Sequence, residues 1–91
     1  MKYEIETTAK FRKGLKTAIR RGLDMALIDA VVERLAAGKP LPAHNCDHTL
    51  TGNWNGYREC HIQPDWLLIY YLDDDVLVLT LTRTGSHSDL Y

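Results

Sequence analysis

The sequence lacks long apolar runs and contains very little cysteine. No stretch of its 91 residues approaches the ~20 consecutive apolar residues that a membrane-spanning helix needs, and residues 1–6 show no apolar segment of a signal peptide. The two cysteines, Cys46 and Cys60, are too few for the disulfide framework of a small secreted domain. These absences argue against a membrane or secreted protein, so we expect a cytoplasmic protein with both thiols reduced.

Several motifs of well-known catalytic and metal sites are also absent. The sequence has no glycine-rich phosphate loop, no G-x-S-x-G and no H-E-x-x-H, and the acidic run at residues 73–75 lacks EF-hand spacing. Cys46, His48, Cys60 and His61 are residue types that bind zinc. However, consecutive Cys60 and His61 would leave opposite faces of a strand, and there is no C-x-x-C pair. Zinc is therefore the weaker alternative, and we expect no metal and no cofactor.

Charge is distributed unevenly along the chain, although the net charge is only −1. Residues 1–22 carry seven basic and two acidic side chains, a net +5, whereas residues 23–91 carry four basic and ten acidic ones, a net −6. Lys10, Lys13 and Lys16 fall on the polar side of a predicted helix, where they can contact phosphate groups. The simpler alternative is a solvated helix face.

The first part of the chain predicts a strand followed by two helices. A weak alternation predicts a short strand over residues 2–6. Apolar residues then recur at helical spacing in two segments: the first follows Thr7 or Thr8 as a cap and ends near Gly22, and the second opens at Asp24. Two helices with so short a connection form a helical hairpin.

Three strands are predicted in the second half, over residues 53–62, 66–72 and 76–82, with a loop at residues 39–52 before them. The resulting order is β-α-α-β-β-β. It predicts a two-layer α+β fold in which the helical hairpin packs on a mostly antiparallel sheet. The length and the absence of linkers or repeats predict one domain over residues 1–91.

All four histidines, His44, His48, His61 and His87, lie after residue 43, and we expect them outside the helices. Histidine titrates near neutral pH and can give or take a proton. Three of them stand near polar or turn residues: His48 beside Asp47, His61 before a turn, and His87 in a Gly/Ser-rich segment. These three are candidates for acid–base chemistry, with an ordinary surface or packed histidine as the alternative in each case.

Arginine and aromatic residues add candidates for substrate binding. Arg58 and Arg83 lie in or at the end of predicted strands, and the planar fork of arginine suits phosphate recognition. An ion pair with a nearby carboxylate is the alternative. Trp54, Trp66 and Tyr91 have rings that can stack on bases. Trp66 begins an apolar strand, which favours the core, whereas Tyr91 is the final residue of the sequence.

Two segments resemble a known toxin family. Residues 47–66 follow the skeleton D-H-x-L-x-G-x-W-x-G-x-R-x-x-H-x-x-P-D-W, and residues 83–91 follow R-x-G-[ST]-H-x-x-L-[FY]. Both patterns are similar to those of the YafQ branch of the RelE toxins. The resemblance implies a RelE-like fold and the toxin of a type II toxin–antitoxin system, an endoribonuclease that cuts messenger RNA in the ribosomal A site.

The resemblance also implies partners and site residues. The partners would be a cognate antitoxin, messenger RNA and the 70S ribosome, with no membrane and no metal. Tyr91 and Trp66 would stack on or position a base. The positions that match the family pattern are His48, His61, Asp65, Trp66, Arg83, His87 and Tyr91.

Metal-free RNA cleavage needs residues of these types. The 2′-OH of the substrate can act as nucleophile, a group that DNA lacks. A base must remove its proton, an acid must protonate the leaving 5′-oxygen, and a cation should stabilise the phosphorane. In this scheme His87 is the acid and Arg83 the cation. His48 or His61 is the base, with Asp65 orienting it or sharing its role.

Two other function classes remain open. One is a non-catalytic RNA- or protein-binding module, which the charged first helix would serve. The other is a catalytically inactive RelE-like protein that binds its antitoxin and acts as co-repressor of their shared operon. The intact set of His48, His61, Asp65 and His87 discriminates between the classes, because a nuclease needs it and neither alternative does.

Overall fold

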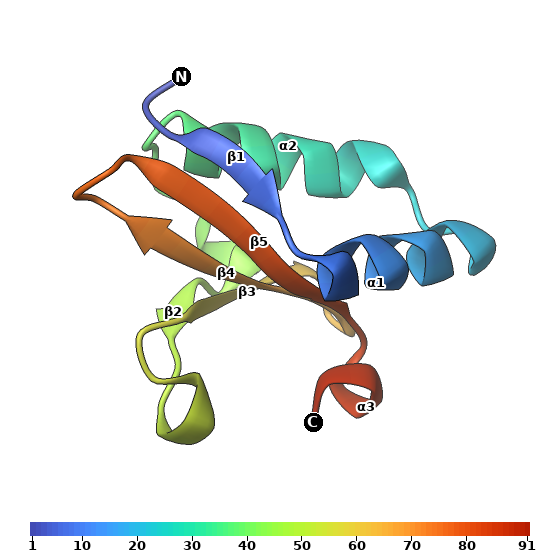
Figure 1. Cartoon of the computed structure of the whole chain (residues 1–91). Coiled ribbons are helices and arrows are strands. Elements are labelled where there is room, and N and C mark those ends of the chain that lie inside the picture. The colour runs from blue at the N-terminus through green and yellow to red at the C-terminus, as the bar shows by residue number, and fades with distance from the viewer.

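The computed structural model covers residues 1–91 and shows a five-stranded sheet with two long helices on one face (Figure 1). β1 is parallel to β5, and the other neighbouring strands are antiparallel. The predicted fold class is therefore confirmed. None of the helices has the length and apolar character that crossing a membrane requires. The long helices and the strands, in sheet order, are α1 (Ala9–Arg20), α2 (Met25–Ala36), β1 (Glu4–Thr7), β5 (Val78–Gly85), β4 (Trp66–Asp73), β3 (Arg58–Gln63) and β2 (His48–Thr49).

Both long helices begin at the residues that the sequence predicts. The side chain of Thr8 accepts a hydrogen bond from the backbone N–H of Phe11 at 3.0 Å, and that of Asp24 accepts one from Ala26 at 3.0 Å. Such caps satisfy N–H groups that have no partner within the helix. α1 lies very close to β5, because a Cβ at Gly14 would be only 2.3 Å from the carbonyl oxygen of Thr84. Glycine at this position therefore permits the contact.

β4 is buried on both faces and supplies two cores. Trp66, Leu68 and Tyr70 pack under α1 and α2 in the main core. The alternate residues Leu67 and Ile69 belong to a smaller core on the opposite face. Full burial of each large apolar side chain contributes about 1.5–3 kcal/mol. β4 is thus a rigid support beneath both faces of the sheet.

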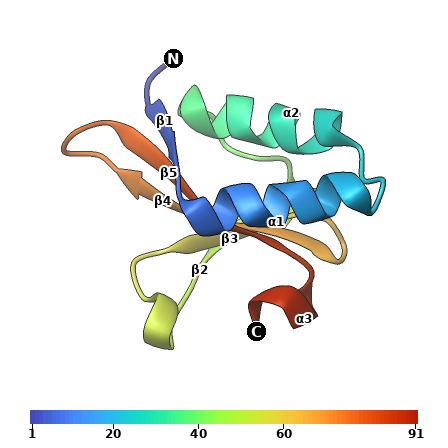
Figure 2. The same ribbon diagram turned by 45° about the vertical axis from the view of Figure 1, so that its right-hand side comes forward.

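The face opposite α1 and α2 carries the one-turn helix α3 (His87–Leu90) and the segment 50–57 (Figures 1 and 2). Leu90 of α3 and Trp54 of that segment pack against the smaller core. Trp54 belongs to the short 3₁₀ helix η2 (Gly52–Trp54), so the strand predicted from residue 53 begins only at Arg58. The last strand also differs from the predicted 76–82, since β5 runs from Val78 to Gly85.

The expectation that all histidines lie outside helices is wrong for two of them. His87 is the first residue of α3, and His44 lies in the 3₁₀ helix η1 (Ala43–Asn45). Elements of one turn are too short to show apolar periodicity. α3 forms because the Ser86 side chain accepts a hydrogen bond from the N–H of Asp89, while the Asp89 carboxylate accepts one from Ser86.

Candidate active site

The strand register places several polar side chains in one area of the sheet. His48 pairs with Glu59, Glu59 with Ile69, and Ile69 with Arg83. Directly paired residues of antiparallel strands share a face, and so do residues two apart in one strand. The side chains of His48, Glu59 and Arg83 therefore leave the face opposite α1 and α2, and His61 shares this face with Glu59.

Glu59 lies at the centre of this group, although the sequence argument assigned it no role. Its Oε1 is 3.5 Å from His48 Nε2 and 4.0 Å from His61 Nε2, and its Oε2 accepts a hydrogen bond from the Tyr91 hydroxyl. The Glu59 side chain is only 6% exposed. The signal that could have revealed it is the alternation of Glu59 and His61 around buried Cys60.

Cys60 faces away from this group, as expected for a residue next to His61 in a strand. It lies in the main core under the helices and is fully buried. Burial is the chief cause that raises the pKa of the Cys60 thiol to about 12. The thiol is therefore protonated and packed, which argues against the zinc set of Cys46, His48, Cys60 and His61.

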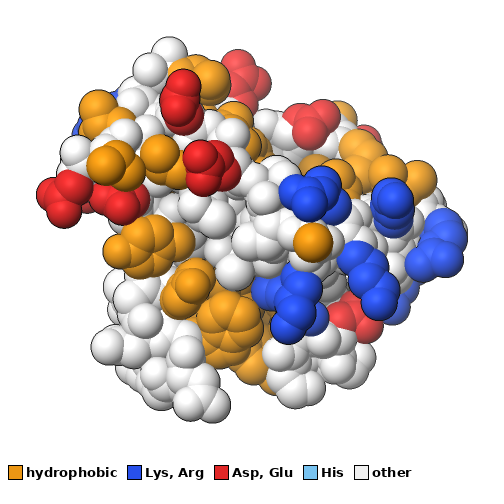
Figure 3. Space-filling view, viewed as in Figure 1, with side chains coloured by type: hydrophobic (Ala, Val, Ile, Leu, Met, Phe, Trp, Pro, Cys, Tyr) orange, Lys and Arg blue, Asp and Glu red, His pale blue; other side chains and the backbone are white.

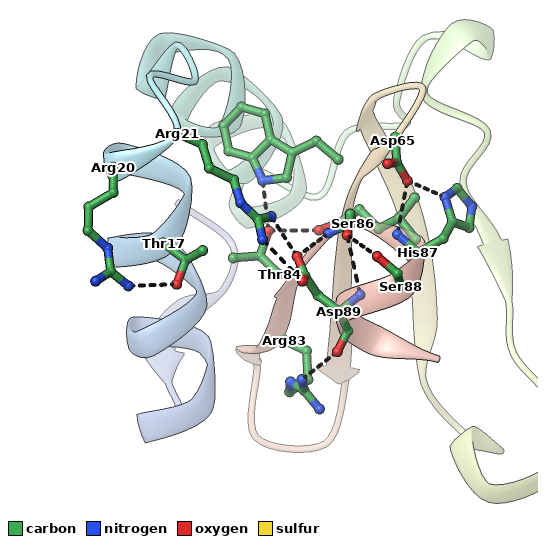
Figure 4. Close-up of polar contacts among 12 residues, drawn as sticks. Thr17, Arg20, Arg21, Asp65, Arg83, Thr84, Ser86, His87, Ser88 and Asp89 are labelled. Atoms are coloured by element: carbon green, nitrogen blue, oxygen red, sulfur yellow. Dashed lines mark hydrogen bonds and ion pairs between the residues drawn. The ribbon is translucent and has the colours of Figure 1, made fainter.

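His87 is held by Asp65, which lies in the turn between β3 and β4 (Figure 4). Asp65 Oδ1 accepts the backbone N–H of His87 at 2.9 Å and lies 2.6 Å from Nδ1 of its ring. These two hydrogen bonds lower the pKa of the Asp65 carboxyl. The same carboxylate oxygen therefore fixes both the backbone and the ring of His87. The expectation that Asp65 orients His48 or His61 is wrong, because its partner is His87.

Three imidazole rings lie side by side at the site. The ring centroids of His48 and His61 are 6.4 Å apart, and those of His61 and His87 are 5.7 Å apart. Nδ1 of His48 is 2.6 Å from the carbonyl oxygen of Cys46. Because a carbonyl only accepts hydrogen bonds, this Nδ1 carries the hydrogen, and the neutral ring has its lone pair on Nε2. The Nδ1 atoms of the two outer rings thus have different partners, a carbonyl oxygen for His48 and a carboxylate for His87.

Arg83 lies near the end of β5, where its side chain borders a hollow next to α1. Together with Lys10 and Lys13 it lines a polar hollow of about 290 Å³ between α1, β5 and α3. Lys16 lines a neighbouring hollow with Lys13 and Arg20. The space-filling view in Figure 3 shows the basic side chains gathered over α1, with most acidic ones towards β1 and the β4–β5 turn. The predicted separation of charge is therefore present on the surface.

Tyr91 and Trp66, both predicted to hold a base, differ in their surroundings. Tyr91 is 61% exposed, and burial of its hydroxyl and the hydrogen bond to Glu59 raise its pKa. Trp66 is only 2% exposed, and its Nε1 donates to Thr84 Oγ1 at 3.0 Å. An indole packed in the core has no face free for a base, so the prediction that Trp66 binds substrate is wrong.

Nearly the whole chain matches one protein family. A sequence model described as "Bacterial toxin of type II toxin-antitoxin system, YafQ" matches residues 3–91. The chain belongs to the YafQ toxin family. The resemblance of the two motif segments is thereby confirmed, and YafQ-family membership extends it over the helices and β1 as well.

Relatives of this YafQ-family chain match it over nearly their full length. The mRNA interferase toxin YafQ of Escherichia coli strain K12 is 40% identical over 89 residues, which is 97% of this chain and 95% of the relative. YafQ in the E. coli DinJ–YafQ toxin–antitoxin complex gives a TM-score of 0.89 at 39% identity, over 100% of this chain and 99% of that one. A metal-bound toxin from Helicobacter pylori gives a TM-score of 0.92 at 43% identity, over 98% of this chain and 99% of that one.

The H. pylori relative is described as metal-bound. In this YafQ-family chain, no group of three or more His, Cys, Asp or Glu side chains is arranged to hold a metal ion. The nearest approach is the pair His48 and His61 around Glu59, where the Glu59 oxygen is 3.5 and 4.0 Å from the two ring nitrogens.

Proposed function

We propose that this toxin is an endoribonuclease that cleaves messenger RNA on the ribosome by acid–base catalysis. The observation that carries the proposal is the convergence of His48, His61 and His87 on one face of the sheet, with different partners for the first and the last. Relatives are described as mRNA interferases, which supports the same activity. Because mRNA and ribosomes are cytoplasmic, we place the protein in the cytoplasm.

His48 acts as the base in this mechanism. The hydrogen bond from Nδ1 to Cys46 keeps the lone pair on Nε2, ready to remove the 2′-OH proton. Glu59 lies 3.5 Å from that nitrogen and stabilises the imidazolium that forms. His61 lies between the other two rings and donates a hydrogen bond to the scissile phosphate.

His87 acts as the acid, and the contact with Asp65 holds its ring in place. The 2′-oxygen attacks phosphorus as its proton passes to His48. The bond from phosphorus to the 5′-oxygen breaks as His87 protonates that oxygen. Arg83 stabilises the added negative charge of the phosphorane. The products are a 2′,3′-cyclic phosphate and a 5′-hydroxyl, and neither a metal nor a cofactor is required.

Residues around this centre bind the RNA. The exposed ring of Tyr91 holds a base beside Glu59 and the histidines. Lys10 and Lys13 line the hollow that contains Arg83, and Lys16 continues the basic surface along α1. These lysines contact phosphates on one side of the cleavage point.

The cognate antitoxin is the second partner. An E. coli relative forms a complex with DinJ, a toxin–antitoxin pair. We expect the antitoxin of this chain to place an acidic segment on the basic face of α1, on the active-site face, or on both, because phosphate sites attract carboxylates. A structure of the complex that buries neither face would refute this placement, although not the activity.

Induction of the protein in a bacterium, followed by mapping of messenger RNA 5′ ends, tests the proposed activity. We expect new 5′ ends inside translated reading frames, and their loss when translation initiation is blocked. The alternative of an inactive co-repressor predicts antitoxin binding and operon repression without any new 5′ ends. That result would refute the nuclease.

A further inference from the structure

Asp89 of α3 contacts three segments that meet beside the proposed site (Figure 4). Its carboxylate accepts two hydrogen bonds from Arg21, at 2.7 and 3.2 Å, and one from the backbone N–H of Ser86 at 2.9 Å. Its backbone carbonyl accepts a hydrogen bond from Arg83 Nη2 at 3.3 Å. One residue thus connects the end of α1, the start of α3 and the arginine assigned to the phosphorane.

α3 depends on such contacts because it is a single turn, His87–Leu90. A helix of this length is not stable by itself. Ser86 and Asp89 cap each other, and Leu90 packs into the smaller core. A Cβ at Gly85 would lie 2.8 Å from the Cβ of Asp89, so glycine there lets Asp89 close back against the end of β5. The local sequence is therefore adapted to Asp89.

Asp89 is negatively charged at neutral pH. The hydrogen bonds from Arg21, followed by the one from the Ser86 backbone, hold the pKa of the Asp89 carboxyl well below its usual range. Its charged partner Arg21 follows directly after α1, a helix that is packed on the sheet. The pair therefore ties a short, weakly stable turn to a well-packed helix.

We propose that Asp89 is a positioning residue for RNA cleavage, holding His87 and Arg83 in a fixed relation to each other and to α1. His87 begins the turn that Asp89 caps, and Arg83 binds the Asp89 carbonyl, so a shift at Asp89 moves the acid and the cation together. The inference rests on the proposed nuclease activity. It adds a residue that the family pattern R-x-G-[ST]-H-x-x-L-[FY] leaves unspecified.

A purely structural Asp89 would give a different kinetic result. In that case its loss would lower activity only in proportion to the folded fraction, and the maximal rate per folded molecule would not change. A displaced acid and cation instead lower the maximal rate. KM does not rise in our interpretation, because Lys10 and Lys13 hold the RNA from α1 and the loss of Asp89 only removes a negative charge from the hollow that they line.

The first comparison is between Asp89→Ala and Ser88→Ala. Ser88 is a matched control in the same turn, and its hydroxyl hydrogen-bonds the Ser86 hydroxyl at 3.1 Å. Each purified full chain is assayed on messenger RNA in a reconstituted bacterial translation reaction, with melting curves to give the folded fraction. We expect Asp89→Ala to lower the maximal rate at least about 10-fold, with no rise in KM. Ser88→Ala should remain close to the parent in both.

The second comparison is between Arg21→Gln and Arg20→Gln, which remove the same charge from the same end of α1. Arg20 bonds only the Thr17 hydroxyl, at 3.3 Å, whereas Arg21 binds Asp89. We expect the maximal rate of Arg21→Gln to fall roughly 3-fold below that of Arg20→Gln, the effect of one exposed ion pair. An effect of the lost charge on RNA binding appears in KM, whereas a displaced acid and cation lower the maximal rate.

Equal maximal rates for folded Asp89→Ala and the parent would overturn the inference, and so would a loss that follows the melting curve. If Asp89→Ala does not fold, the comparison of Arg21→Gln with Arg20→Gln tests the inference instead. Equal maximal rates for these two variants would then overturn it. If the parent itself cleaves no RNA, the proposed function fails and the inference falls with it. The two failures therefore give different results.

Discussion

Replacement of His87 by alanine separates chemistry from stability at the proposed site. The His87 side chain is 55% exposed and that of its partner Asp65 is 69% exposed, so the change creates neither a buried cavity nor a buried unpaired charge. The backbone N–H of residue 87 still donates to Asp65. We therefore expect the free energy of unfolding to change by less than about 1 kcal/mol.

The effect on cleavage should be far larger. If His87 gives its proton to the leaving 5′-oxygen, its loss slows cleavage by about 10²–10⁴-fold, the usual contribution of a general acid. The assay is growth arrest after induction at equal expression, together with cleavage by the purified protein and its binding to the antitoxin. We expect growth arrest to disappear while folding and antitoxin binding persist.

His44→Ala is the matched control. His44 lies in η1, is exposed, and has no place in the proposed mechanism. Its variant should remain toxic. If His87→Ala is still fully toxic at equal expression, the acid is a different group and the assignment is wrong. A structural His87 would show the opposite pattern, with lost stability and activity falling only as the folded fraction falls.

Four further predictions follow from the fold and the site. Gly14→Ala should lower the free energy of unfolding by about 1–3 kcal/mol in urea titrations, because its Cβ would meet the Thr84 carbonyl at 2.3 Å. Trp66→Phe should also destabilise the protein by about 1–3 kcal/mol, yet cleave normally per folded molecule, and a selective loss of cleavage would contradict its core assignment. Because the folded pKa of Asp89 lies below the unfolded value of about 3.9, its stabilising effect is present at neutral pH and lost on acidification, so the melting temperature of Asp89→Asn should fall less below about pH 4 than that of the parent. Protein stripped with EDTA and then dialysed should melt and cleave like untreated protein, whereas stoichiometric zinc whose removal abolishes activity would support a metal site.

The long elements could be predicted because apolar spacing determines them. α1, α2 and β4 start within one or two residues of their expected positions, at caps and at the beginning of an apolar run. β2 and α3 could not be predicted, since they have only two and four residues. β2 exists because β3 pairs with it, and α3 exists because of its caps and its contacts with distant residues.

The sequence predicted which residue types gather at the site more accurately than which of them contact each other. Motif matches identified His48, His61 and His87, but not which carboxylate serves which ring. Asp65 and His87 are 22 residues apart and meet only through the β3–β4 turn and the end of β5. Glu59 became visible only through strand register. For Trp66, the apolar run that follows it was a better guide than the family pattern.

The position of β5 has a consequence for folding during synthesis. β5 is the last of the five strands in the chain, yet it lies between β1 and β4 in the sheet. β1 therefore has no partner strand until residues 78–81 have been synthesised. In contrast, β3 and β4 can pair early, because only a short turn separates them. His48 and His61 are also synthesised before Arg83 and His87. A chain interrupted at that stage has the proposed base without the proposed acid, so we expect it to be unable to cleave messenger RNA.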